Sequence, residues 1–308
     1  MNVRMIPFAP FCDASGLSEI IPAEKVLSEQ MTLWYTADTN SRSSRFDGFI
    51  EKNRSFEHAA HIYARRHKRM EHSTPADAST YQVICMRPDT WRIENAGVRF
   101  FLLTGSKKAL LIDSGMTVHN AKDIAEEITD LPLSLLNTHA DRDHTGSNEQ
   151  FPSFYMHPAD EALYRRSGKA GDILPIQDGD ILDLGDRELM IIGLPGHTPG
   201  SIAVLDKKYR VLISGDSLQE HGHIFMFGER RNMKDYVSSM ERLDKMTSEF
   251  DEIWPSHGDL PICPDTVRKH CDGARQILNR EINGTETEFF GQKIRVYQVG
   301  ETAFLCSE

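Results

Sequence analysis

The chain has 308 residues, enough for one large domain or two smaller ones that bury a substantial apolar core. Hydrophobic residues make up 39% of it, and no run approaches the roughly 18 consecutive apolar residues of a membrane helix. The formal charge of -11 argues against a nucleic-acid partner, because an acidic surface repels phosphates unless a local basic patch overcomes it.

Residues 1–78 are interpreted as an N-terminal extension, because they lack regular alternation and end in the turn-rich stretch HSTPADAS. We expect this segment to cover the main domain, to form a lid, or to make homodimer contacts. Pro7, Pro10 and Asp13 interrupt the apolar core that a secretory leader would need, so no cleavable leader is expected. Five cysteines without a CxxC pair agree with a reducing compartment, and the protein is predicted to be cytoplasmic.

From residue 81 the sequence changes to short apolar runs, and YQVICM, VRFFLLTG and KALLID predict strands. TVHNAKDIAEEITDL predicts a helix with Val118, Ile124 and Ile128 on one face. LSLLNT and SFYMH predict two more strands, and a helix is expected over residues 158–166.

Four strands are then predicted in quick succession, at ILDLG, RELMIIGLPG, SIAVLD and RVLISGD. Helices over residues 232–245 and 264–280 enclose a short strand at DEIWPS, and TEFFG, KIRVYQV and TAFLC predict a final strand group. Strands interleaved with helices favour an α/β (α+β) domain over residues 79–308, in which two sheets pack together with helices outside.

THADRDHTG, residues 138–146, places several metal-capable side chains directly after a predicted buried strand. These side chains belong to His139, Asp141, Asp143 and His144. A polar loop at such a place is commonplace, but three later loops after strands each add one good ligand: His197 in GLPGHTPGS, Asp216 in ISGDSL and His257 in IWPSHGD. Imidazole and carboxylate are ligands of zinc, iron and manganese, and catalytic sites draw them from several strand ends. The sequence therefore predicts a metal site.

The motif order is HxxxDH, GHTPGS, SGDS and PSHG, preceded by LLIDSG, which ends at Gly115. It resembles the metallo-β-lactamase superfamily, in the branch of glyoxalase II-type thioesterases and lactonases, over about residues 81–260. The resemblance implies a four-layer αββα metallo-β-lactamase sandwich, here with an N-terminal extension. It also implies two divalent metal ions as cofactors, held between the sheets.

The resemblance further implies a role for each residue of the motifs. The ligands would be His139 and His197 for the first metal, Asp143, His144 and His257 for the second, and Asp216 between them. Asp113, in the first motif, would organise the surrounding loops without binding a metal.

One position departs from the family pattern HxHxDH, because this chain has HADRDH with Asp141 in place of the second histidine. A carboxylate is a harder ligand than imidazole, so zinc is expected first, with iron or manganese open at the first site if Asp141 binds metal. The diiron flavoproteins of the same superfamily carry an acid there too, but nothing in this sequence resembles a flavin phosphate loop. Alternatively, Asp141 points to solvent or to Arg142, and a single metal is tightly held.

A dinuclear site can lower the pKa of a bound water toward neutrality, which gives a metal-bound hydroxide without a side-chain nucleophile. The sequence has no GxSxG elbow and no CGSC-like signature, so a metal-dependent hydrolase is predicted in which Asp143 orients the hydroxide or moves its proton. The GHTPGS motif favours an ester, thioester or lactone of a small metabolite as substrate. The alternatives are a phosphodiesterase or sulfatase of the same superfamily, a diiron redox protein without a flavodoxin domain, and a non-catalytic binding module.

The segment QEHGHIFMFGERRN, just after Asp216, is the best candidate for the wall of a substrate cleft. The residues expected to bind substrate there are His221, His223 and Arg230, with Arg231 as a further cation for a carboxylate or phosphate. Residues 225–227 would add an apolar surface. The alternative is an ordinary connecting segment whose aromatic side chains enter the core and whose arginines face water.

Overall fold

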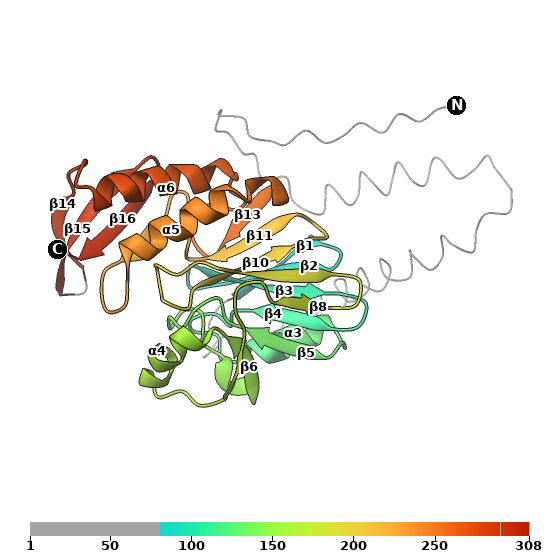
Figure 1. Ribbon diagram of the computed structural model, residues 1–308. Coiled ribbons are helices and arrows are strands. Elements are labelled where there is room, and N and C mark those ends of the chain that lie inside the picture. Colours follow the sequence, from blue (N-terminus) through green and yellow to red (C-terminus); the bar gives the residue numbers. More distant parts are fainter. Residues whose placement is uncertain (1–80, 290, 308) are drawn as a thin grey trace, which may run out of the picture. The chain divides into compact units, whose positions relative to one another are not determined.

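The structure is a computed structural model, which describes residues 81–289 and 291–307 (Figure 1). The predicted N-terminal extension over residues 1–78 lies outside the described residues. Within the described part, two sheets pack against each other and helices cover their outer faces.

The first sheet has seven strands that follow one another in sequence order. They are β1 (Tyr81–Arg87), β2 (Thr90–Asn95), β3 (Val98–Thr104), β4 (Ala109–Ile112), β5 (Leu133–Leu136), β6 (Ser153–Met156) and β7 (Asp172–Pro175). Strands β1 to β4 are antiparallel, and β4 to β7 are parallel. Strands β2 and β7 were not predicted from the sequence.

Helix α3 (Ala121–Ile128) connects β4 to β5 and buries one face against the first sheet. The predicted helical periodicity is confirmed for Ile124 and Ile128, which lie on the buried face of α3. Val118 is buried in the same apolar cluster, but it precedes the helix, which begins at Ala121 and not at Thr117. The helix expected over residues 158–166 is instead two short elements, the 3-10 turn η2 (Pro158–Asp160) and the helix α4 (Glu161–Arg166). Two further 3-10 turns are η1 (Asn148–Gln150) and η3 (Thr247–Glu249).

The second sheet has five strands in the order β13-β11-β10-β9-β8. They are β8 (Ile181–Asp183), β9 (Glu188–Gly193), β10 (Ile202–Asp206), β11 (Val211–Gly215) and β13 (Glu252–Pro255). Every residue of β10 is buried because both faces of this strand are covered. Ile202 and Val204 face the first sheet, while Ala203 and Leu205 face the helices.

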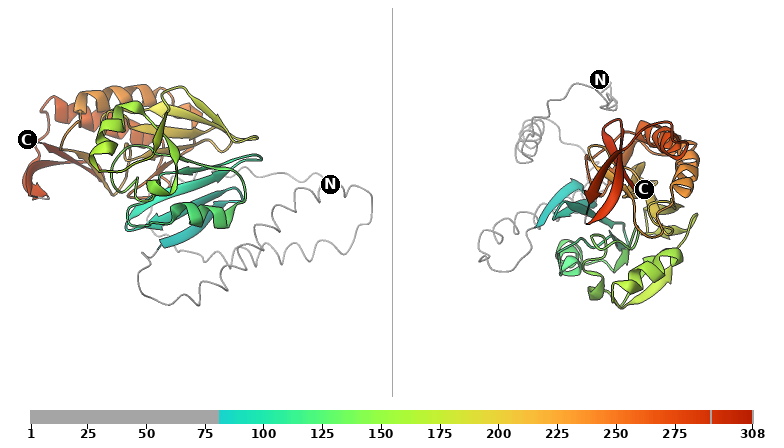
Figure 2. Two further views of the ribbon diagram at one scale, coloured as in Figure 1. Left: turned by 90° about the horizontal axis from the view of Figure 1, so that it is seen from below. Right: turned by 90° about the vertical axis from the view of Figure 1, so that its left-hand side faces the viewer.

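Helices α5 (Met233–Asp244) and α6 (Asp265–Leu278) cover the outer face of the second sheet, and both views in Figure 2 show them together on one side. The layer order is therefore helix, sheet, sheet, helix, which is the αββα arrangement that the motifs implied. No helix in the described part of the chain is long and apolar enough to cross a membrane.

A third sheet was not expected from the sequence. Its order is β12-β16-β15-β14, with β12 (His223–Met226), β14 (Thr285–Phe289), β15 (Gln292–Val299) and β16 (Thr302–Ser307). The candidate cleft segment thus contains a strand that pairs in parallel with β16. Met226 is buried in the core between this sheet and the helices, so its assignment to a cleft wall is wrong. Phe225 and Phe227 are partly buried and stack with Phe289.

Helix α6 buries a titratable side chain, that of His270, between two hydroxyl groups. Its Nδ1 lies 3.1 Å from Tyr236 Oη, and its Nε2 lies 3.3 Å from Thr302 Oγ1. Burial lowers the pKa of His270 to about 4. The folded chain therefore favours neutral His270, whereas an unfolded chain takes up a proton near the ordinary histidine pKa of about 6.5.

We predict that His270 makes the folded state less stable as the pH falls from about 6.5 toward about 4, by up to about 1.4 kcal/mol per pH unit. The sign follows because the unfolded chain binds more protons in this window. Urea denaturation at several pH values should give a shallower pH dependence for His270→Gln, but not for the matched variant His119→Gln, whose side chain is exposed. Equal slopes in all three proteins would contradict the prediction.

Candidate metal centre

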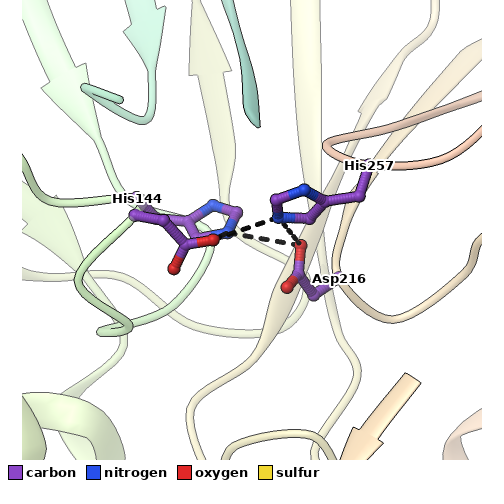
Figure 3. A group of neighbouring side chains, drawn as sticks. His144, Asp216 and His257 are labelled. Atoms are coloured by element: carbon purple, nitrogen blue, oxygen red, sulfur yellow. Dashed lines mark hydrogen bonds and ion pairs between the residues drawn. The ribbon is translucent and has the colours of Figure 1, made fainter. Parts of the chain in front are cut away.

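The predicted ligands follow the ends of four strands and lie together in the fold. Residues 138–146 follow β5, His197 follows β9, Asp216 follows β11 and His257 follows β13. Figure 3 shows His144, Asp216 and His257 pointing toward one another, although they are up to 113 residues apart in sequence, counted from 144 to 257. The structure thus brings strand ends of both sheets to one place.

The first group of ligand atoms comes from His139, Asp141 and His197. Asp141 Oδ2 lies 3.2 Å from His197 Nε2 and 3.6 Å from His139 Nε2. Both histidines are buried, while Asp141 is partly exposed. Asp141 therefore points into the site. The alternative in which it points to solvent or to Arg142 is wrong.

The second group comes from Asp143, His144, Asp216 and His257. Asp143 Oδ2 lies 3.4 Å from His144 Nε2 and 3.1 Å from His257 Nε2. His144 and Asp216 are buried, whereas Asp143 and His257 keep 28% and 25% of their side-chain surface accessible. The second group is therefore the one with more open access to solvent.

Asp216 presents one oxygen to each group. Its Oδ2 lies 4.0 Å from His139 Nε2 and 3.8 Å from His197 Nε2, in the first group. Its Oδ1 lies 3.2 Å from His144 Nε2 and 3.5 Å from His257 Nε2, in the second. This geometry fits the bridging position that the resemblance implied for Asp216.

Each of the four histidines has its Nδ1 held by a fixed partner, so its Nε2 is directed into the site. These pairs are His139 with Thr138 Oγ1 at 3.0 Å, His144 with Asp113 Oδ2 at 2.8 Å, His197 with the Phe225 carbonyl at 2.9 Å, and His257 with the Gly97 carbonyl at 2.9 Å. Thr138, Phe225 and Gly97 were not predicted as partners of these histidines. Two of the contacts use backbone oxygens, which carry no sequence signal.

The residues present fit a divalent metal. Within the described part of the chain, His139 Nε2, His144 Nε2 and Asp216 Oδ1 are buried without a hydrogen-bond partner. Buried polar atoms are normally paired, so three buried ligand atoms that face one centre without a hydrogen-bond partner fit the binding of a cation. Nitrogen and oxygen donors of this kind suit zinc, iron or manganese.

Asp113 lies behind the second group and has its own set of donors. It accepts hydrogen bonds from the Thr138 backbone N–H and hydroxyl, each at 2.8 Å, and lies 2.8 Å from His144 Nδ1. Its φ of +63° is in the left-handed region, which few non-glycine residues adopt. These contacts fit the organising role predicted for Asp113, because they fix both the loop after β5 and the ring of His144.

The carboxylates of the site are held in their ionised form. Burial of Asp216 favours the neutral acid, but attraction to His257 and His144 is stronger, so the pKa of Asp216 lies below its usual value. Burial of Asp141 is likewise outweighed by the neighbouring side chains of His139 and His197, and the pKa of Asp141 lies well below its usual value. Ionised carboxylates are the form that binds a cation.

The histidines differ between the two groups. Burial lowers the pKa of His197, and the nearby positive charge of Arg231 lowers it further. In the second group, attraction to Asp216 and Asp143 outweighs burial and raises the pKa of His257. The first group therefore presents a neutral imidazole at His197, as metal binding requires.

The residues expected to bind substrate all lie on the surface. His221 is exposed, with Nδ1 2.7 Å from Asp259 Oδ2, and His223 is exposed at the start of β12. Arg230 is exposed, and its Nη1 lies 3.5 Å from the Ala159 carbonyl. Their role in substrate binding stays a prediction.

Arg231 differs from its neighbour, because its side chain reaches the first ligand group. Its Nη2 lies 2.6 Å from Asp141 Oδ2, and its Nη1 donates to the His197 carbonyl at 2.6 Å. From the sequence alone, Arg231 was predicted to hold a substrate anion. The unusual acid at position 141 was the only sequence signal for a nearby cation, but a separation of 90 positions along the chain hid the pairing.

The family model described as the metallo-beta-lactamase superfamily matches residues 96–257, and the chain belongs to this superfamily. The curated acyl-coenzyme A thioesterase MBLAC2 of Homo sapiens is 27% identical over 200 residues, which cover 51% of this chain and 71% of that protein. The hydroxyacylglutathione hydrolase of Gloeobacter violaceus is 32% identical over 142 residues, which cover 44% of this chain and 55% of the relative.

Among solved structures, the metallo-beta-lactamase from Pontibacter korlensis has a TM-score of 0.54 and 14% identity, and the match covers 64% of this chain and 99% of that one. The DIM-1 metallo-beta-lactamase has the same TM-score of 0.54 at 15% identity. Likeness at this level of identity shows the fold and carries no information on substrate.

We predict that Asp113→Asn weakens metal binding by about 10- to 100-fold, as is typical when the partner of a metal-binding histidine is lost. The Asp113 carboxylate accepts from the Thr138 backbone N–H on one oxygen and lies against the Thr138 hydroxyl and His144 Nδ1 with the other. An amide has only one accepting oxygen, so one of these two sides loses its acceptor and the ring of His144 is held less firmly. The affinity is measured by competition between the protein and a chelator of known affinity for zinc.

The matched control for this prediction is Asp123→Asn, on the exposed face of α3. It should bind zinc as the wild-type chain does. Zinc binding by Asp113→Asn that equals the wild type, with both variants folded, would contradict the role given to Asp113.

Proposed function

We propose that the protein is a dinuclear metal-dependent hydrolase that cleaves a thioester. The observation that carries this proposal is the pair of ligand groups with one oxygen of Asp216 directed to each. Two bound divalent cations supply Lewis acidity, which lowers the pKa of water toward neutrality. The first group would hold one cation, the second group would hold the other, and Asp216 would contact both.

Asp143 is the residue of this chain best placed to handle the attacking water. It belongs to the second group, and 28% of its side-chain surface is accessible, against 5% for Asp216. Burial opposes its ionisation, but attraction to His144 lowers the pKa of Asp143 well below its usual value. We therefore assign Asp143 the task of accepting a hydrogen bond from water and orienting it toward the substrate carbonyl.

The thioester class is supported by the relatives and by the chemistry of the site. The two relatives are named for acting on an acyl-coenzyme A and on a hydroxyacylglutathione, and both substrates carry an acyl group on a thiol. A thiolate leaves readily, so an acyl-thiol bond does not require a strong general acid at the leaving group. This suits a site in which the carboxylates are held ionised.

A second candidate, a diiron redox centre, is favoured by one observation, the carboxylate of Asp141 in the first group. The two candidates differ in their substrates, because a redox centre consumes oxygen and a reductant whereas the hydrolase consumes water and an acyl-thiol substrate. Protein purified in air without added metal would contain iron and would take up oxygen in the presence of a reductant, whereas the hydrolase would release thiol from an acyl-thiol substrate.

We predict metal-dependent release of thiol from an acyl-coenzyme A or acyl-glutathione substrate, measured with a thiol-reactive chromophore. Turnover should disappear after treatment with a chelator and return on addition of zinc or manganese. Asp143→Asn should lower kcat by about 100-fold or more, because an amide cannot orient water as a carboxylate does.

The control is Asp272→Asn, an exposed aspartate on α6, which should retain wild-type turnover. A metal-loaded chain that cleaves lactones or phosphodiesters but no thioester would contradict the thioester as substrate class and leave the metal-dependent hydrolase in place. Turnover that survives complete metal removal would overturn the proposal as a whole.

A further inference from the structure

Asp141 places a negative charge where the family pattern has a neutral imidazole, and the structure places one cation against it. Arg231 Nη2 lies 2.6 Å from Asp141 Oδ2, the same oxygen that faces His139 and His197. The Arg231 side chain is only 13% exposed, and that of Asp141 is 23% exposed. A pair this short and this sheltered is screened far less than a surface ion pair.

We propose that Arg231 is a positioning residue that supplies the countercharge of Asp141, so that the first ligand group has the net charge of three neutral imidazoles. The proposal rests on the metal centre assigned under the proposed function. The negative charge of Asp141 and the positive charge of Arg231 cancel, and both histidines of the group bind metal in their neutral form. The departure from the family pattern is thereby compensated within the same site.

The position of Arg231 is fixed by the chain around it. The backbone N–H of Asn232 donates to the Gly196 carbonyl at 2.9 Å, and the Asn232 side chain caps α5 by accepting from Lys234 N at 2.9 Å. The residue before α5 is thus held beside the loop that carries His197. A guanidinium has a planar fork of donors, which suits it to hold two acceptors at once.

Those two acceptors belong to two different ligand loops. Arg231 Nη1 donates to the His197 carbonyl at 2.6 Å, and Nη2 donates to Asp141 Oδ2 at 2.6 Å. Arg231 therefore fixes the distance between the loop after β5 and the loop after β9, as well as the charge between them. Arg230 has neither contact and is exposed, so the two adjacent arginines form a natural comparison.

This arrangement has a consequence that can be measured. If Asp141 is replaced by histidine, Arg231 becomes an unpaired cation beside the first metal position and should repel a divalent ion. If Arg231 is also replaced by glutamine, the ligand set becomes the neutral family pattern and binding should return. Arg231→Gln alone leaves an uncompensated carboxylate, which should shift preference from zinc toward the harder manganese.

The experiment compares four full-length chains with the wild type: Asp141→His, Arg231→Gln, the double variant and the control Arg230→Gln. Zinc and manganese are titrated separately into each metal-free protein in competition with a chelator of known affinity. We expect Asp141→His to bind zinc at its weaker site about tenfold less tightly than the double variant does. The manganese-to-zinc affinity ratio should rise about tenfold in Arg231→Gln and stay unchanged in Arg230→Gln.

Circular dichroism establishes that each variant is folded. If Asp141→His does not fold, the same comparison is made between Asp141→Asn and the double variant that combines Asp141→Asn with Arg231→Gln. The countercharge role would be overturned if the effects of Asp141→His and Arg231→Gln on metal affinity simply added in the double variant. It would also be overturned if Arg230→Gln changed metal affinity as much as Arg231→Gln does. Neither result would contradict the metal centre itself. A wild-type chain that binds neither metal would overturn the proposed function, and the role of Arg231 with it.

Discussion

The structure depends on one electrostatic constraint: three carboxylates and four imidazoles converge on one centre at the ends of strands from two sheets. The Nδ1 atoms of the imidazoles have fixed partners at the edge of this centre. Inside it, Nε2 of His139, Nε2 of His144 and one oxygen of Asp216 have no hydrogen-bond partner among the described residues. Burying charged and polar groups in this way is unfavourable unless a cation balances them. The fold is thus arranged so that a divalent metal completes it.

The sequence predicted the members of this centre because each follows an apolar run that could be identified as a strand. His197 and Asp216 stand directly after such runs, and the spacing within residues 138–146 identified the rest. The order of predicted strands and helices favoured two packed sheets with helices outside, but periodicity could not fix the αββα topology, which came from resemblance to the family. Backbone partners such as the Phe225 and Gly97 carbonyls were beyond reach, since a carbonyl belongs to every residue and only the tertiary fold selects one.

Two predictions from the sequence, for residues 223–226 and for Arg231, failed for physical reasons. Residues 223–226 looked like part of a loop because the segment is short and flanked by glycines and charges, yet it pairs with β16 and buries Met226. Strand pairing between segments about 80 residues apart leaves no local signal. Arg231 was grouped with Arg230 as a cation for a substrate anion, because charge alone does not show which of two adjacent arginines turns toward the ligand groups. In both cases, packing decided what local sequence left open.

The central claim is that two cations occupy the two ligand groups with Asp216 between them. Anomalous diffraction from crystals of the metal-loaded protein, collected above and below the absorption edge of the bound metal, tests it most directly. The account predicts two peaks, one within reach of His139, Asp141 and His197 and one within reach of Asp143, His144 and His257. A single peak, or peaks that none of these side chains contacts, would contradict it.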